Sequence, residues 1–97
     1  MISKDHIQNN FSKALKRARI AQGQSQESFG LVSSRTYVSS LERGLKVPTL
    51  NKVDELAQVI GVHPLTLLAL SYAVDCPRAE LGLLFQKVAD ELHKVLD

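Results

Sequence analysis

The chain has 97 residues, of which 44% are hydrophobic and 23% charged, a composition that fits one compact domain with little room for a second core. Polar residues interrupt its apolar runs well before the roughly 20 residues that a membrane-spanning helix needs. The N-terminal residues lack the apolar core of a secretory signal, and a lone Cys76 cannot form an intramolecular disulfide. The sequence therefore predicts a cytoplasmic protein that does not cross a membrane, with Cys76 as a buried or half-buried thiol.

Charge is distributed unevenly along the chain. Residues 1–53 hold nine Lys and Arg against three Asp and Glu, whereas residues 54–97 hold three against seven. A basic half next to an acidic half indicates one surface that binds a polyanion and a second surface with another task. An ordinary solvated surface could show the same counts, so charge alone does not decide between the two.

The first predicted helix covers residues about 8–22. Phe11, Leu15 and Ala18 recur at helical spacing, and Gly23 is expected to end the helix. Lysines and arginines occupy the other side. The sequence thus begins with an amphipathic helix that has a basic outer face.

Two short helices are predicted next. Ser25 can cap the first of them, which has Phe29 and, as a second candidate, Leu31 on its apolar side, and Gly30 should end it early. Ser33 or Ser34 then caps a helix over residues 35–43, which Gly44 should stop in a left-handed conformation.

Three more helices follow and complete an all-α fold. Thr49 caps a helix over about 50–60 that ends at Gly61, with an inward stripe of Leu50, Val53, Leu56, Ala57 and Ile60. Pro64 begins another, over 65–72, which is apolar on nearly every side and is predicted to be buried. After a linker at 75–77, a helix over about 78–96 has its own apolar stripe. We expect a five-helix domain over residues 1–74 and a separate C-terminal helix over 75–97.

The order and spacing of four segments resemble the λ-repressor-like, or Xre, family of bacterial and phage regulators. These segments are SQES at 25–28, SSRTYVSSLERG at 33–44, VPTL at 47–50 and IGVHPLTLL at 60–68. The resemblance covers residues about 8–72 and implies a DNA-binding domain that reads its site with the helix at about 34–43. Family members usually have two more residues between the Ser-Gln-Glu start of the second helix and the cap of the third, and a Gly in the turn. The second helix is therefore expected to be shortened, or its turn reshaped.

Candidate DNA-reading residues lie on the first turns of the third helix. The major groove of DNA is wide enough to admit one such helix. Most are short, so the backbone can approach the DNA, and Arg35 is the long donor suited to a bidentate contact with guanine. The base-reading candidates are Ser34, Arg35, Thr36, Ser39 and Ser40.

A second group of residues is expected to contact phosphates, which fixes register without reading sequence. Gln26 has this role by resemblance, Arg43 and Lys46 extend the contact along the following loop, and Tyr37 combines packing with a phosphate contact. The resemblance also implies that Arg19 and Glu42 form a structural ion pair that braces the reading helix.

The C-terminal helix is a candidate dimer interface, because regulators that read two half-sites about 34 Å apart are two-fold dimers. Its stripe could equally pack back on the chain's own core. The stripe consists of Leu81, Leu84, Phe85, Val88, Leu92, Val95 and Leu96.

Enzymatic activity is not predicted. His6, His63 and His93 lie far apart in the sequence, and His63, beside Pro64, suits a capping or packing role. No spacing suits zinc and no Gly-rich loop suits a nucleotide, so no metal or cofactor is expected. The predicted function is a homodimeric transcriptional regulator that represses its own or an adjacent promoter from an inverted repeat. The alternatives are a DNA-binding antitoxin, whose remaining surface binds a toxin, and a restriction-modification controller.

Overall fold

The computed structural model describes residues 8–97, so His6 and the charges of Lys4 and Asp5 lie outside the described residues. This part of the chain contains helices and no strand, which confirms the all-α prediction. The elements are α1 (Phe11–Ala21), the 3-10 turn η2 (Gln26–Phe29), α2 (Arg35–Glu42), α3 (Leu50–Ile60), α4 (Pro64–Ala73) and α5 (Arg78–Leu96). Within the described residues no helix is by itself long and apolar enough to cross a membrane, and only α3 and α4 taken together, bent by 101°, pass such a test.

Side-chain caps begin α2, α3 and α4 where the sequence predicts, but the predicted cap Ser25 makes no side-chain capping bond at η2, and α1 begins at Phe11, after an Asn10 cap, not at residue 8. Ser34 Oγ accepts a hydrogen bond from the Tyr37 backbone N–H, and Thr49 Oγ1 accepts one from the Lys52 N–H, each at 3.1 Å. His63 Nδ1 accepts one from the Leu65 N–H at 2.9 Å, which confirms its capping role at the start of α4.

Left-handed glycines end the helices. Gly23, Gly44 and Gly61 follow α1, α2 and α3 with φ of 69°, 75° and 89°, in a region that glycine enters without steric cost. All three stops are as predicted.

The second helix is shortened to the four residues of η2, as predicted. Gly30 follows η2 with φ −54°, so a left-handed glycine does not end it. Instead, the N–H groups of Val32 and Ser33 both donate to the Phe29 carbonyl, at 2.9 and 2.8 Å, and turn the chain toward α2. Phe29 is fully buried, but Leu31 is fully exposed, so its predicted packing role is wrong. The tight turn carries the Leu31 side chain away from the core.

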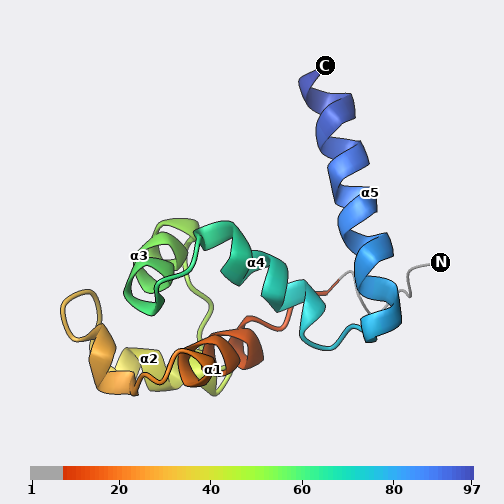
Figure 1. Ribbon diagram of the computed structural model, residues 1–97. Coiled ribbons are helices and arrows are strands. Elements are labelled where there is room, and N and C mark those ends of the chain that lie inside the picture. The colour runs from red at the N-terminus through yellow and green to blue at the C-terminus, as the bar shows by residue number, and fades with distance from the viewer. Residues whose placement is uncertain (1–7) are drawn as a thin grey trace.

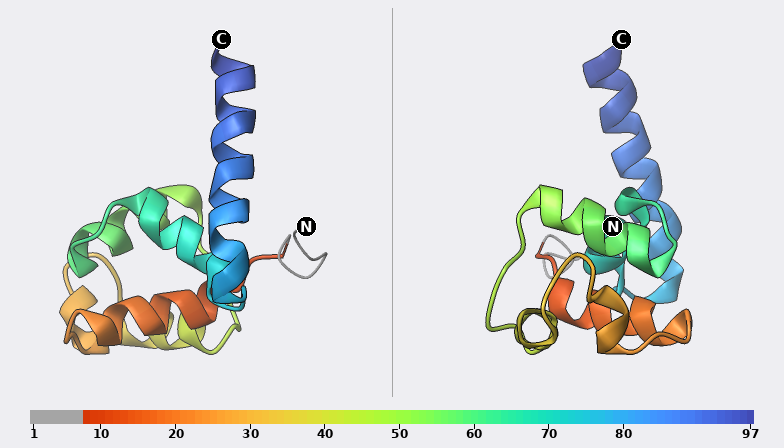
Figure 2. Two further views of the ribbon diagram at one scale, coloured as in Figure 1. Left: turned by 45° about the vertical axis from the view of Figure 1, so that its right-hand side comes forward. Right: turned by 90° about the vertical axis from the view of Figure 1, so that its left-hand side faces the viewer.

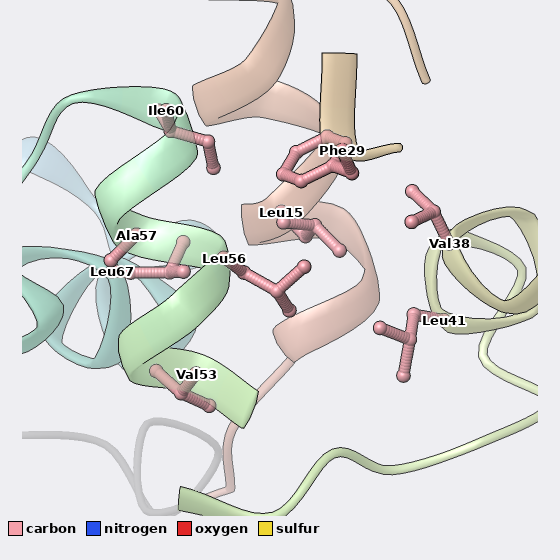
Figure 3. Packing of buried hydrophobic residues seen from close by; sticks show 9 residues of the cluster. All are labelled: Leu15, Phe29, Val38, Leu41, Val53, Leu56, Ala57, Ile60 and Leu67. Atoms are coloured by element: carbon pink, nitrogen blue, oxygen red, sulfur yellow. The ribbon is translucent and has the colours of Figure 1, made fainter. Parts of the chain in front are cut away.

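One hydrophobic cluster holds α1, η2, α2, α3 and α4 together (Figure 3). In it α1 packs against α2 and α4, and α3 packs against α4 and η2. The buried side chains of the cluster are Leu15, Phe29, Val38, Leu41, Val53, Leu56, Ala57, Ile60 and Leu67. Phe29 of η2 and Val38 and Leu41 of α2 therefore share one core with side chains of α1, α3 and α4.

Two predictions about burial are wrong. Leu50, assigned to the inward stripe of α3, is 72% exposed because the first turn of the helix projects past the core. The apolar helix α4 buries only Leu67 and Ser71, and Leu65 is 62% exposed. A helix that is apolar on all sides does not reveal which face packs, and here one face covers the core while another remains open.

α5 stands away from the other helices, as Figures 1 and 2 show from three directions. No residue of α5 is buried. The linker before it is attached to the start of α1, because the Asp75 carboxylate accepts hydrogen bonds from Asn10 Nδ2 at 2.9 Å and from Lys13 Nζ. Cys76 is buried as predicted, and desolvation raises the pKa of its thiol.

Candidate nucleic-acid interface

The short helix α2 has two unlike faces. Val38 and Leu41 are fully buried and point into the core. Arg35, Thr36 and the residues one turn further along lie on the opposite, accessible face, because positions three and four apart in a helix share a side. α2 is therefore held from behind and presents polar groups in front.

These polar groups line a surface depression of about 300 Å³ between α2 and η2. It brings together four of the five base-reading candidates and two of the four phosphate candidates. Ser34, the remaining base-reading candidate, does not line the depression and caps α2. The residues that line the depression are Gln26, Arg35, Thr36, Ser39, Ser40 and Arg43.

Tyr37 and Lys46 lie together outside that depression. The ammonium of Lys46 is 5.6 Å from the centre of the Tyr37 ring, and that of Lys52 is 5.9 Å from it, within the range of cation–π attraction. Lys52 Nζ also donates to the Val32 carbonyl at 2.7 Å. The two lysines place positive charge beside an aromatic ring that packs against the core. The role of Lys52 is not evident from the sequence, because its position depends on the path of the loops before α2 and α3.

Arg35 is paired with an acidic neighbour across the turn. Its Nε lies 3.2 Å from Glu27 Oε1, and both side chains are largely exposed. The pKa of Glu27 is lowered by a hydrogen bond from its own backbone N–H, then by one from Ser25, and then by the charge of Arg35. The carboxylate is therefore ionised at neutral pH. No sequence pattern points to Glu27, since only the shortened turn brings it to Arg35.

A buried polar cluster joins α1 to α2. Arg19 Nε and Nη2 donate to the two oxygens of Glu42 at 2.8 and 2.9 Å, and the side chains are 12% and 3% exposed. Arg19 Nη1 donates to the Gln24 carbonyl at 2.9 Å. The hydrogen bond with Glu42 is the main cause that raises the pKa of Arg19. The pair joins α1 to α2, and the raised pKa keeps Arg19 positively charged.

Gln26 joins the same cluster. Its Nε2 donates to Glu42 Oε1 at 3.1 Å, so the amide that the resemblance assigns to a phosphate is directed at Glu42 in the free protein. The cluster thereby connects α1, η2 and α2. In this network the guanidinium of Arg19 and the carboxylate of Glu42 both have partners.

Two short helical segments joined by a tight turn, with an accessible polar face on the second, define a helix-turn-helix protein. The Helix-turn-helix family model matches residues 15–67, which is more than half of the chain. The chain belongs to this λ-repressor-like, or Xre, helix-turn-helix family and is a DNA-binding transcriptional regulator. No curated protein and no solved structure matches it.

Proposed function

We propose that the chain is a homodimeric repressor of its own or an adjacent promoter, which reads an inverted repeat through α2. The observation that carries the proposal is the polar depression at α2 and η2, where six accessible polar side chains converge on a helix small enough for the major groove. Such a regulator acts in the cytoplasm, where its operator is.

Within this proposal the side chains divide into two classes. Arg35 donates to a guanine, and Ser34, Thr36, Ser39 and Ser40 contact base edges or the phosphates beside them. Arg43, Lys46, Tyr37 and Gln26 bind phosphates and fix the register of the protein on the duplex. The positive charge beside Tyr37 supports this second class, since a phosphate there would meet the ammonium groups of Lys46 and Lys52.

The dimer is proposed to form through α5. Two half-sites of an inverted repeat need two reading helices related by a two-fold axis. α5 is amphipathic and does not contribute to the core of the domain, which supports a role outside it. The residues proposed for the interface are Leu81, Leu84, Phe85, Val88, Leu92, Val95 and Leu96.

Selection of bound sites from random DNA, followed by gel-shift titration over a salt series, tests the proposal. Arg35→Ala should relax the preference at one base pair per half-site, by about 1–3 kcal/mol. Lys46→Ala should weaken binding to all sequences and lower the salt slope by about one unit. Lys94→Ala, on the polar side of α5, is the matched control and should change neither. Absence of binding at low salt, or an unchanged site preference for Arg35→Ala, would contradict the proposal.

An antitoxin is the second candidate, and one observation favours it. The apolar face that α4 and α5 leave open could bind a toxin instead of a second copy. A restriction-modification controller would bind DNA in the same manner as a repressor. Neighbouring genes distinguish the three: a toxin gene, a restriction enzyme gene, or neither.

A further inference from the structure

An apolar groove separates α4 from α5 where the two helices diverge. Its volume is about 510 Å³. The groove is lined mainly by apolar side chains, and Leu68, which lines it, also packs against the core cluster. Its apolar walls are Leu65, Leu68 and Tyr72 of α4, and Leu84, Phe85 and Val88 of α5.

Beyond the groove, the apolar stripe of α5 continues toward the C-terminus as an exposed surface. Leu92, Val95 and Leu96 are all more than half exposed. The other side of the helix is polar, with Gln86, Lys87, Asp90, Glu91 and Lys94 along a separate shallow depression. α5 therefore has an apolar face that is recessed near its base and free at its tip.

The stripe is symmetric about its centre. Leu81 and Val95 are seven residues before and after Val88, and Leu84 and Leu92 are four residues before and after it. Positions four and seven apart share one side of a helix. Two copies of α5 that run antiparallel about Val88 therefore match leucine with leucine, and Leu81 with Val95.

From these features we propose that each α5 tip occupies the α4–α5 groove of a second copy. With Val88 at the two-fold axis, the partner's Leu92 meets Leu84, which lines the groove, and the partner's Val95 meets Leu81. The proposal rests on the homodimer proposed above, and it specifies the direction of the helices and the residues of α4 that complete the interface.

The available apolar surface is large enough for such an interface. From their exposed fractions, the side chains at 65, 72, 85, 88, 92, 95 and 96 together present on the order of 700 Å² per chain, close to the ~800 Å² per partner of a standard interface. A parallel pair of α5 helices would leave the groove, and with it Leu65 and Tyr72, uncovered. Reciprocal exchange covers both the groove and the tip.

Disulfide cross-linking in the full chain tests the direction of the helices. An antiparallel pair centred on Val88 places the two copies of Val95 about 21 Å apart along the axis, too far for a disulfide. Val95→Cys alone should therefore not cross-link, whereas a mixture of Val95→Cys and Leu81→Cys should form mixed dimers. The unmodified chain, with its buried Cys76, is the control for both. Efficient cross-linking of Val95→Cys alone would show a parallel pair and overturn the proposal.

Sedimentation without DNA tests whether the groove is filled. Leu65 and Leu45 are both 62% exposed, and only Leu65 lies in the groove. Leu65→Gln should raise the dimer dissociation constant about tenfold, and Leu45→Gln should leave it unchanged. Equal constants for the two variants, or a monomeric unmodified chain, would overturn the proposal. A parallel dimer that still binds operator DNA would refute the proposed docking of the α5 tips but not the repressor function. A dimer with the expected cross-links that does not bind DNA would refute the repressor function but not the docking.

Discussion

Glu42→Gln should destabilise the domain while it preserves the volume of the side chain. The substitution leaves the guanidinium of Arg19, 12% exposed, with a neutral partner in place of a carboxylate that accepts two hydrogen bonds of 2.8 and 2.9 Å. Breaking a buried pair in this way costs about 3–5 kcal/mol, a large fraction of the roughly 5–15 kcal/mol that holds a domain folded. The thermal midpoint should fall by at least about 12 °C.

Urea unfolding followed by circular dichroism measures this loss. Glu91→Gln, which removes a carboxylate from the exposed Lys87–Glu91 pair, is the control and should change the free energy of unfolding by less than about 0.5 kcal/mol. The loss in Glu42→Gln should be equal at pH 6 and pH 8, because the raised pKa of Arg19 keeps the guanidinium charged at both. A loss below about 1 kcal/mol would show that the pair does not brace the fold.

Further substitutions test the caps, the stops and the linker. Ser34→Ala removes the cap of α2 and should cost about 1 kcal/mol in urea unfolding. Gly61→Ala forces a Cβ into a left-handed residue with φ 89° and should cost about 1–2 kcal/mol, whereas Gly82→Ala, in open space within α5, should stabilise that helix by about 0.5–1 kcal/mol. Equal effects at the two glycines would refute the conformational argument. The hydrogen bond from Lys13, and then that from Asn10, lowers the pKa of Asp75 below its ordinary 3.8. The contribution of Asp75 to the stability is therefore fully present above pH 3.8, and it is lost as the pH falls through the lower pKa of the folded state. Asp75→Asn should abolish this pH dependence of the unfolding free energy. An ordinary pKa of Asp75, measured by NMR in the folded protein, would contradict the argument.

The sequence was sufficient to predict the helices, because their signals are local. Caps at Ser34 and Thr49 and glycines at 23, 44 and 61 act within one turn, so the helix ends follow from residue type and spacing. The shortened second helix was also predictable, since two residues are missing from a known pattern. The exposed faces of α4 were not predictable, because a uniformly apolar helix does not specify which neighbour it meets.

The site divides in the same way. The accessible polar face of α2 follows from helical periodicity once α2 is placed. The roles of Glu27 and Lys52 could not be predicted from the sequence. Glu27 contacts Arg35 and Lys52 contacts Tyr37, and in both cases the distance between the two segments depends on the turn and the loops. The direction of Gln26 toward Glu42 likewise requires three elements in place. Local sequence patterns determine which residues are exposed on α2, and the tertiary structure determines which groups those residues contact in the free protein.

The two faces of α2 have a consequence for how this regulator can change. Folding depends on Val38, Leu41 and Glu42, whereas Arg35, Thr36, Ser39 and Ser40 contribute nothing to the core. On the proposed role of α2, substitutions at these positions alter the contacts with the operator while they leave the buried core unchanged. If the proposed reading role of α2 holds, point mutations in this one eight-residue helix are enough to change the DNA target without rebuilding the domain.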